Sequence, residues 1–391
     1  MKKIVKRILL VLLVTFVCLG GVAVWRVGLL APGHVKNPVI PDTPGFALVK
    51  ELQLGWNLGN TLEAHQREDT YGLDDETRWG NPKTTQAMID AVKAAGFATV
   101  RVPVTWAYHM GDAPDYTIDA AWLDRVQEVV DYAYERDLFV ILNMHHDDAY
   151  WFIPDKKHEA ATTAQFTRLW EQLADRFADY GEKLLFEAAN EPRVVGTLLE
   201  WGGGTMCERA VLGRLNAKFV ETVRASGGQN ATRWLLIPTY GASYEPVPMA
   251  ALKLPDDPRL IVSIHAYAPL VFAFENKAGA KSTPDSNEFT DAVRQQVDKT
   301  LGRIYRTFVA KGIPVYLGEF GAVSKDNEPA RAEYAAHYLR EAARYGMTCG
   351  WWDNGGSGTS QEVFALLDRD TLTWKYPALL AALDETAHEN S

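Results

Sequence analysis

Residues 184–192 read Leu184-Leu185-Phe186-Glu187-Ala188-Ala189-Asn190-Glu191-Pro192, and residues 315–321 read Val315-Tyr316-Leu317-Gly318-Glu319-Phe320-Gly321. Each stretch contains a short apolar run that ends in a carboxylate. An apolar run of this length, closed by a breaking residue, is typical of a buried strand. A glutamate at the end of such a strand lies at the rim of a core, where desolvation can shift its pKa. The two stretches therefore predict two carboxylates, Glu191 and Glu319, at the ends of two separate strands.

A pair of carboxylates from separate strands is what glycoside hydrolysis requires. One carboxylic acid protonates the leaving oxygen, and the second carboxylate acts at the sugar carbon. Glu187 has the same strand parity as Glu191 but lies four residues deeper. We therefore interpret Glu187 as a paired structural acid within the fold.

Apolar runs with strand character recur along the chain, and amphipathic helical stretches separate them. The strand-like runs occupy residues 52–58, 99–104, 138–144, 184–189, 234–238, 260–265, 315–318 and 348–353. The helical stretches occupy residues 84–95, 121–135, 164–180, 209–226, 288–311 and 330–345. The link between the fifth and sixth strands contains several prolines and shows little helical periodicity. This alternation predicts an α/β fold of the (β/α)8 TIM-barrel type.

A barrel of this type carries its chemistry at the C-terminal ends of its strands. Besides Glu191 and Glu319, the candidate residues at these ends are Asn60, Glu63, Arg101, His145, His146, Asn190, His265, Tyr267 and Trp352. Acids, bases, amides and aromatic rings in one place fit a carbohydrate better than they fit a random surface. We therefore expect these residues to line one sugar-binding cleft.

Several motifs, in matching order, carry a family resemblance. They are Gly55-Trp56-Asn57-Leu58-Gly59-Asn60-Thr61-Leu62-Glu63, Trp79-Gly80-Asn81-Pro82, Val100-Arg101-Val102-Pro103, Asn190-Glu191-Pro192, His265-Ala266-Tyr267, Gly318-Glu319-Phe320-Gly321 and Trp351-Trp352-Asp353-Asn354-Gly355. With these motifs the chain resembles glycoside hydrolase family 5, and in particular its cellulase branch. The resemblance covers roughly residues 50–380.

The resemblance implies a retaining endo-β-1,4-glucanase that hydrolyses internal β-1,4-glucosidic bonds by double displacement. It implies Glu319 as the nucleophile, kept ionised by Arg101 and by the hydroxyl of Tyr267. It implies Glu191 as the acid/base, whose pKa must then be raised by burial or by a nearby negative charge. Asn190 is expected to hold the sugar 2-hydroxyl, and Trp352 to form the apolar floor. Further hydrogen bonds to sugar or carboxylates are expected from Asn60, Glu63, His145, His146 and His265.

Other interpretations stay open at this point. The same mechanism could act on xyloglucan, mixed-linkage β-glucan or mannan. A non-catalytic glycan-binding barrel belongs to another class, although binding alone does not require two acids at these positions. His145-His146-Asp147 has the composition of a metal cluster, but the resemblance favours sugar contacts and loop capping and implies no metal and no cofactor. The ring of Trp201, on the loop after the fourth strand, could stack on a sugar or pack in its loop.

Composition limits the possible partners. The chain has 391 residues, a formal net charge of −10 and no basic run after Arg7, which argues against nucleic acid as a partner. We expect a monomer whose partner is a β-glucan polysaccharide or oligosaccharide. Cys207 and Cys349 show no disulfide or metal spacing and are predicted to be isolated buried thiols.

The first 33 residues have the pattern of an export leader. Basic residues between Lys2 and Arg7 precede an apolar stretch at residues 8–25, which is typical of a signal peptide. That stretch also approaches the ~20 residues of a membrane span. We expect a signal peptide or N-terminal membrane anchor at 1–33, a linker at 34–45 and a catalytic domain at 46–385. The enzyme would be secreted, periplasmic or anchored at the outer face of the cytoplasmic membrane.

Overall fold

The structure is a computed structural model that describes residues 34–66, 71–274, 283–356 and 362–389. The leader expected at residues 1–33 lies outside these ranges. Within them, no helix combines the length and the hydropathy that a membrane span needs.

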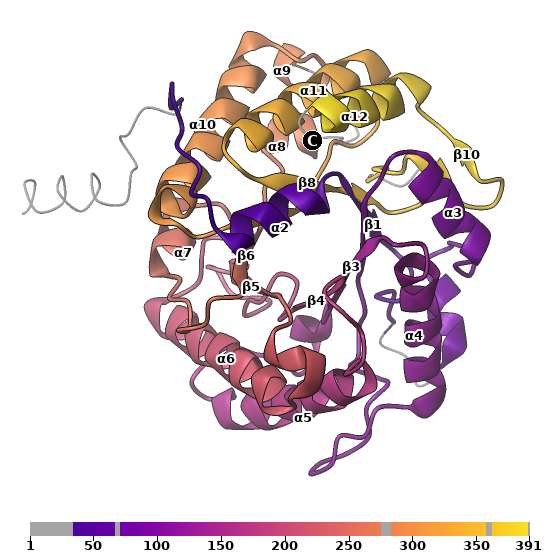
Figure 1. Ribbon diagram of the computed structural model, residues 1–391, viewed down its shortest axis with the longest axis vertical. Helices are drawn as coiled ribbons and strands as arrows, with labels where there is room; N and C mark the ends of the chain where they lie inside the picture. Colours follow the sequence, from indigo (N-terminus) through magenta and orange to yellow (C-terminus); the bar gives the residue numbers. More distant parts are fainter. Residues whose placement is uncertain (1–33, 67–70, 275–282, 357–361, 390–391) are drawn as a thin grey trace, which may run out of the picture.

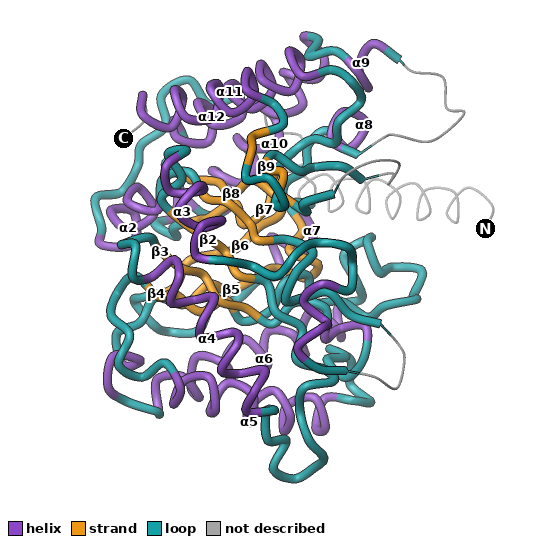
Figure 2. Tube along the Cα trace, turned by 90° about the vertical axis from the view of Figure 1, so that its right-hand side faces the viewer, coloured by secondary structure: helices purple, strands orange, loops and turns teal. Residues whose placement is uncertain are grey.

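Eight parallel strands close into a barrel in which each strand pairs with the next and β8 pairs with β1. The strands are β1 (Gly55–Leu58), β2 (Thr99–Val102), β3 (Phe139–Asn143), β4 (Leu184–Glu187), β5 (Leu235–Ser243), β6 (Leu260–His265), β7 (Val315–Phe320) and β8 (Thr348–Asp353). Figure 2 shows the strands in the centre with helices above and below them. The predicted (β/α)8 barrel is confirmed.

Helices follow the strands and surround the barrel (Figure 1). They are α3 (Gln86–Ala94), α4 (Ala120–Tyr134), α5 (Glu159–Arg176), α6 (Met206–Ala225), α7 (Pro246–Ala251), α8 (Leu270–Ala273), α9 (Pro284–Asn287), α10 (Asp291–Thr307), α11 (Glu328–Arg344) and α12 (Pro377–Glu389). The six predicted helical stretches correspond to α3, α4, α5, α6, α10 and α11. The link between β5 and β6, which lacked helical periodicity, holds only the six-residue α7.

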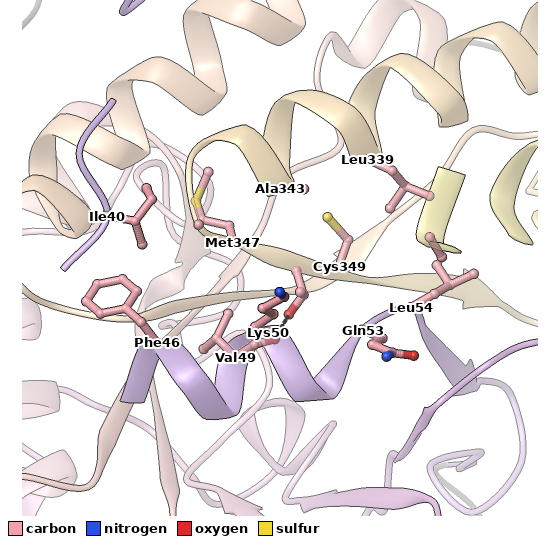
Figure 3. A pocket seen from close by; sticks show the side chains of 13 residues that line it. Ile40, Phe46, Val49, Lys50, Gln53, Leu54, Leu339, Ala343, Met347 and Cys349 are labelled. Carbon is pink, nitrogen blue, oxygen red and sulfur yellow. Dashed lines mark hydrogen bonds between the residues drawn. The ribbon is translucent and has the colours of Figure 1, made fainter. Parts of the chain in front are cut away.

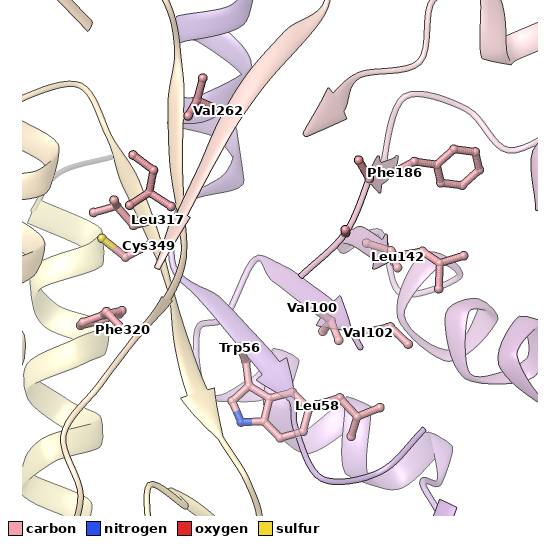
Figure 4. Packing of buried hydrophobic residues seen from close by; sticks show 14 of the residues in the cluster. Trp56, Leu58, Val100, Val102, Leu142, Phe186, Val262, Leu317, Phe320 and Cys349 are labelled. Carbon is pink, nitrogen blue, oxygen red and sulfur yellow. The ribbon is translucent and has the colours of Figure 1, made fainter. Parts of the chain in front are cut away.

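Side chains that alternate along each strand build two separate cores. On β3, Val140 and Leu142 point outward and belong to the large cluster between strands and helices. Figure 4 shows part of this cluster, including Trp56 and Leu58 of β1. The alternate residue, Ile141, belongs to a smaller cluster inside the barrel. The period-two pattern of a strand therefore sorts side chains between helix-facing and barrel-facing sides.

Helix α2 (Pro44–Leu52) packs against the inner cluster at the N-terminal ends of the strands and was not predicted from the sequence. The segment before it, expected as a linker, is held to the barrel by a tyrosine of α10 and a tyrosine at the end of α11. The backbone N–H of Val35 donates to the Tyr345 hydroxyl at 3.0 Å, and that of Val39 donates to the Tyr305 hydroxyl at 2.9 Å. The described part of this segment is therefore docked on the barrel.

A pocket of about 310 Å³ lies beside α2, and Phe46, Leu54, Met347 and Cys349 are among the residues that line it (Figure 3). Leu54 and Thr348 lie at the N-terminal ends of β1 and β8. The pocket is thus at the opposite end of the strands from the predicted carboxylate pair. Because barrel chemistry is placed at the C-terminal ends of the strands, this pocket is not expected to take part in it.

Both cysteines in the described part of the chain are free thiols, as predicted. Cys349 is buried, but Cys207 is exposed. The expectation of burial was wrong for Cys207 because it lies in the first turn of α6, which begins at Met206 on the surface.

The buried side chain of Arg233, just before β5, connects to the segment that leads into β4. Its side chain is 2% exposed. The guanidinium donates to the backbone carbonyls of Leu184, Phe177 and Tyr180 at 2.7, 2.8 and 2.9 Å. Losing the guanidinium would remove a charged donor from all three carbonyls, two of which belong to buried residues.

We predict that Arg233→Met lowers the free energy of unfolding by roughly 3 kcal/mol, because three backbone carbonyls lose a charged donor. Urea unfolding followed by circular dichroism measures the change. Arg340→Met is the matched control, since Arg340 is exposed and its nearest carboxylate, Glu389, is 4.0 Å away. Equal stability of the two variants would show that Arg233 does not hold these loops.

Candidate active site

A buried cation organises the inside of the barrel below the C-terminal ends of the strands. Arg101 of β2 has no exposed surface. Its Nε donates to Glu187 Oε2 at 2.7 Å, and its Nη2 donates to Asn190 Oδ1 at 2.8 Å. Its Nη1 donates to Glu319 Oε1 at 2.8 Å and to Asn57 Oδ1 at 2.9 Å. Two carboxylates and two amides from β1, β7 and the end of β4 therefore meet on one guanidinium. The two carboxylates raise its pKa against the opposing effect of burial.

Glu187 is the structural acid that its strand position predicted. It is fully buried. One carboxylate oxygen accepts from Arg101 and from Asn143 Nδ2 at 2.9 Å, and the other accepts from the Ser263 hydroxyl at 2.5 Å. Both oxygens are thus engaged within the barrel, so Glu187 compensates part of the charge of Arg101.

An irregularity in β7 aims Glu319 into the same layer. The register of β7 shifts against both of its neighbours, so that Glu319 pairs with His265. Gly318 lies against β6 at this point, where an added Cβ would be 3.0 Å from the Ser263 hydroxyl and 3.1 Å from His265 Nε2. A bulge re-aims a side chain in this way, and the small residue before Glu319 permits the close approach.

Donors on two sides fix the Glu319 carboxylate. Oε1 accepts from Arg101, and Oε2 accepts from the Tyr267 hydroxyl at 2.8 Å. Burial, together with the charge of Glu319, raises the pKa of Tyr267, so its hydroxyl keeps the proton that it donates. A cation and a hydrogen-bond donor both favour an ionised carboxylate.

Glu191 lies across from Glu319, and His265 lies between them. His265 Nδ1 is 2.9 Å from Glu191 Oε1 and 3.5 Å from Glu319 Oε2. One oxygen of each carboxylate and the His265 nitrogen all lie within 4.8 Å of one another. A retaining glycoside hydrolase holds its carboxyl groups about 5–5.5 Å apart, whereas an inverting enzyme needs a wider gap for a water molecule. The observed closeness fits the retaining arrangement.

The pKa of Glu191 differs from the sequence-based expectation. Burial acts to raise it, but the hydrogen bond and charge of His265, with the charge of Arg193, lower it below its usual value. The pKa of His265 is raised in turn: burial acts to lower it, and Glu319 and Glu191 more than offset that effect. Both shifts favour the imidazolium–carboxylate form of this pair.

The cleft above these residues has a volume of about 500 Å³. Of the predicted site residues, those that line it are His145, His146, Asn190, Glu191, His265, Tyr267, Glu319 and Trp352. The rings of His145 and Trp352 are nearly parallel, with centroids 5.7 Å apart. Burial lowers the pKa of His145, so it is neutral near pH 7 and can exchange hydrogen bonds without carrying charge.

Asn60 and Glu63 take a different position from the other predicted residues. Glu63 has no exposed surface, and its carboxylate accepts from the backbone N–H groups of Asn60 and of Thr61, the latter at 2.9 Å. The side chain therefore closes the turn after β1 and does not reach the cleft. Acidic side chains commonly satisfy backbone donors at turns, and that use explains Glu63 better than the expected sugar contact.

The cluster His145-His146-Asp147 does not converge as a metal site. Asp147 accepts from the backbone N–H of Trp106 and from the Trp151 indole at 2.8 Å, so its carboxylate caps the loop. In the described ranges, Glu191, His265 and Glu319 form the one group whose donor atoms come close enough for a metal ion. Glu319 already accepts from a cation and a hydroxyl, which fits an anionic nucleophile better than a metal ligand.

The sequence did not identify the cleft residues on β5 and the following loop. Ser243, Tyr244 and Glu245 line the cleft, whereas the predicted fifth strand ended at residue 238. The strand continues past a bulge in which Gly241 and Ala242 have φ angles of +62° and +45°. The aromatic ring of Phe274 and that of Phe364 also line the cleft and follow later strands.

Trp201, for which stacking and packing were both open, lines the cleft and is 61% exposed. It lies on the loop between β4 and α6. By contrast, Trp122, Trp170 and Phe177 are buried core residues.

Comparison with known proteins gives consistent matches. The family profile described as Cellulase (glycosyl hydrolase family 5) matches residues 64–358. The Cellulase/esterase CelE of Acetivibrio thermocellus is 45% identical over 344 residues, which are 88% of this chain and 40% of that protein. Endoglucanase A of Ruminococcus albus is 42% identical over 354 residues, which are 90% of this chain and 95% of that protein. The chain thus spans under half of the first relative and nearly all of the second.

Solved structures agree with these relatives. A broad-specificity endoglucanase from Ruminococcus champanellensis with bound cellotriose superposes with a TM-score of 0.83 at 45% identity, covering 88% of this chain and 99% of that one. A xyloglucan-specific endo-β-1,4-glucanase from a metagenomic library, in complex with cellotriose, gives a TM-score of 0.82 at 38% identity. It covers 87% of this chain and 98% of that one.

Proposed function

This chain belongs to glycosyl hydrolase family 5, and we propose from that premise that it is a retaining endo-β-1,4-glucanase in which Glu319 is the nucleophile and Glu191 the acid/base. The observation that carries the assignment of roles is the contrast between the two carboxylates. Glu319 is held by Arg101 and Tyr267, two groups that favour its anion. Glu191 is held by His265, a group that can exchange a proton with it.

The first displacement forms a bond between a Glu319 oxygen and the anomeric carbon, while the bond to the leaving oxygen breaks. Glu191 gives a proton to that oxygen. The charge of Glu319 is then consumed in the ester. In the second displacement Glu191 takes a proton from water, the water oxygen attacks the anomeric carbon, and Glu319 leaves as a carboxylate.

His265 reconciles the low pKa of Glu191 in the unliganded protein with its role as an acid. The pair can hold its proton as imidazolium and carboxylate or as imidazole and carboxylic acid. A sugar that fills the cleft excludes water, which penalises the charged form of the pair relative to the neutral form. The proton then resides on Glu191, next to the leaving oxygen.

The remaining cleft residues supply substrate contacts in this proposal. Asn190, already oriented by Arg101, presents its amide to the sugar 2-hydroxyl, a bond that strengthens in the transition state. Trp352 offers the apolar floor, and the neutral rings of His145 and His146 line the same cleft. Burial lowers the pKa of His146 to about 3 and also lowers that of His145, so both rings are neutral near pH 7.

The substrate is a β-1,4-linked glucan, and the alternatives are xyloglucan, mixed-linkage β-glucan and mannan. Of the relatives described above, one is named an endoglucanase and another is named a xyloglucan-specific endo-β-1,4-glucanase. A non-catalytic glycan-binding barrel is disfavoured, because binding does not require two carboxylates within 4.8 Å of each other.

Purified protein assayed on a panel of soluble β-glycans tests the proposed activity. We predict release of oligosaccharides and a rapid fall in viscosity with carboxymethylcellulose, mixed-linkage β-glucan or xyloglucan, since internal cleavage shortens chains early. Glucose as the first product, without a fall in viscosity, would contradict internal cleavage. Activity restricted to mannan would move the assignment to that substrate.

Substitution of each carboxylate separates the two roles. We predict that Glu319→Gln loses at least about 10⁴-fold in kcat, because no covalent intermediate can form. Glu191→Ala should retain far more activity on 2,4-dinitrophenyl β-cellobioside, whose leaving group needs no proton, and added azide should give a β-glycosyl azide. Near-normal hydrolysis of polysaccharide by either variant would contradict the assignment.

We further propose export through the leader at residues 1–33, on the basis of its basic and apolar segments. The mature chain from its native host should begin near residue 24 if the leader is cut, or should carry residues 1–25 in the membrane fraction if it is not. N-terminal sequencing of fractionated cells distinguishes the two. A full-length chain free in the cytoplasm would contradict both.

A further inference from the structure

Arg193 forms a second charged centre, outside the polar layer of the barrel. It lies two residues after Glu191 on the loop between β4 and α6. Its Nη1 pairs with Asp148 Oδ2 at 2.5 Å and donates to the backbone carbonyl of Glu191 at 2.9 Å. Its Nε pairs with Glu200 Oε1 at 3.0 Å, and its guanidinium carbon lies 4.1 Å from the centre of the Trp201 ring.

The contacts of Arg193 hold an otherwise exposed ring in place. The guanidinium covers part of the Trp201 ring, which keeps 61% of its surface exposed and lines the cleft. Glu200 ties the loop to itself through the backbone N–H of Gly196 at 2.8 Å. A planar guanidinium stacked on an indole is a favourable arrangement that an ammonium group does not reproduce.

The position of Trp201 identifies the sugar that it would meet. Strands β4 and β8 are four places apart in the eight-stranded ring, so they lie on opposite sides of the barrel (Figure 1). Trp352 ends β8, whereas Glu191 and Trp201 follow β4. Since Glu191 protonates the leaving oxygen, the leaving sugar lies on the Trp201 side of the carboxylate pair.

We propose that Arg193 is a positioning residue that holds the Trp201 ring as the stacking surface for the leaving sugar and orients Glu191 toward the oxygen of that sugar. The inference rests on the proposed glucanase function and deepens it. It assigns a specificity role to a residue that itself touches neither the reacting carbon nor the nucleophile.

Arg193 also sets the charge around Glu191. The groups that face Glu191 are His265 and Tyr267 from β6 and its end, Glu319 from β7, His146 and Asp148 from the loop after β3, and, from its own loop, Arg193, which also pairs with Glu200. The charge of Arg193 helps to lower the pKa of Glu191. Burial raises the pKa of Asp148 to about 7, and Arg193 opposes that rise. Without Arg193, a cation is lost and the acids remain, so the pKa of Glu191 rises.

The experiment compares Arg193→Met, Arg193→Lys and Trp201→Ala on two substrates. Cellopentaose places sugars on the leaving side, whereas 2,4-dinitrophenyl β-cellobioside places none there and needs little protonation. For Arg193→Met we expect kcat/KM to fall about tenfold or more on cellopentaose and less than about threefold on the aryl glycoside. Trp201→Ala should show the same split between substrates. Arg214→Met is the matched control, because Arg214 is exposed on α6 and pairs with Glu159.

The pH profile separates charge from stacking. In Arg193→Met the alkaline limb of kcat/KM on cellopentaose should move up by about one pH unit, because Glu191 stays protonated to higher pH. Arg193→Lys should keep the alkaline limb of kcat/KM near its wild-type position but lose activity on cellopentaose. The lysine ammonium group keeps the positive charge but lacks the planar guanidinium that stacks on Trp201.

Equal losses on both substrates with an unchanged pH profile would overturn the inference and leave Arg193 a structural residue. Variants that behave as wild type on both substrates would overturn it as well. In either case wild-type hydrolysis of cellopentaose would leave the glucanase assignment standing. A wild-type protein that cleaves the aryl glycoside but not cellopentaose would contradict both proposals.

Discussion

The charge of Arg101 inside the barrel is the constraint on which the site depends. A buried guanidinium must be paired and hydrogen-bonded, because an isolated charge in a low-dielectric interior is very unfavourable. Here the compensation comes from Glu187 and Glu319, and Asn57 and Asn190 accept the remaining protons. The same contacts that stabilise the cation therefore fix the nucleophile and orient the amide beside the acid/base. Removing one partner would leave charge uncompensated at the centre of the fold, which typically costs about 3–5 kcal/mol.

The two carboxylates differ because their neighbours differ. Glu319 accepts its hydrogen bonds from groups that can only stabilise its anion, namely a guanidinium and a phenol with a raised pKa. Glu191 meets His265, which can give or accept a proton at ordinary pH. Nε2 of His265 has no hydrogen-bond partner within the described residues, so Nδ1 is the nitrogen through which His265 contacts both acids. One histidine thus contacts both the proposed acid/base, Glu191, and the proposed nucleophile, Glu319.

Sequence reasoning succeeded where regular periodicity and the strand-end rule apply. Alternating apolar runs and helices predicted the barrel, and strand parity predicted that Glu187 is structural. Glu319 was placed correctly at a strand end, but the direction of its side chain depends on a register shift beside Gly318 that a period of two does not predict. Sequence reasoning also missed the end of β5, where Gly241 and Ala242 adopt positive φ angles.

Other failures came from partners that are distant in sequence or from unexpected local bonds. The pKa of Glu191 is set by His265, 74 positions away, and no local pattern reveals that contact. Glu63 has the residue type of a sugar ligand but accepts backbone N–H groups within its own turn.

The central claim is that Arg101 and Tyr267 hold Glu319 as the nucleophile. It is tested most directly by trapping the enzyme with a 2-deoxy-2-fluoro-β-cellobioside and mapping the labelled peptide by mass spectrometry. The account predicts a fluorocellobiosyl ester on Glu319. A label on another residue, or no label on an enzyme that hydrolyses cello-oligosaccharides, would contradict it.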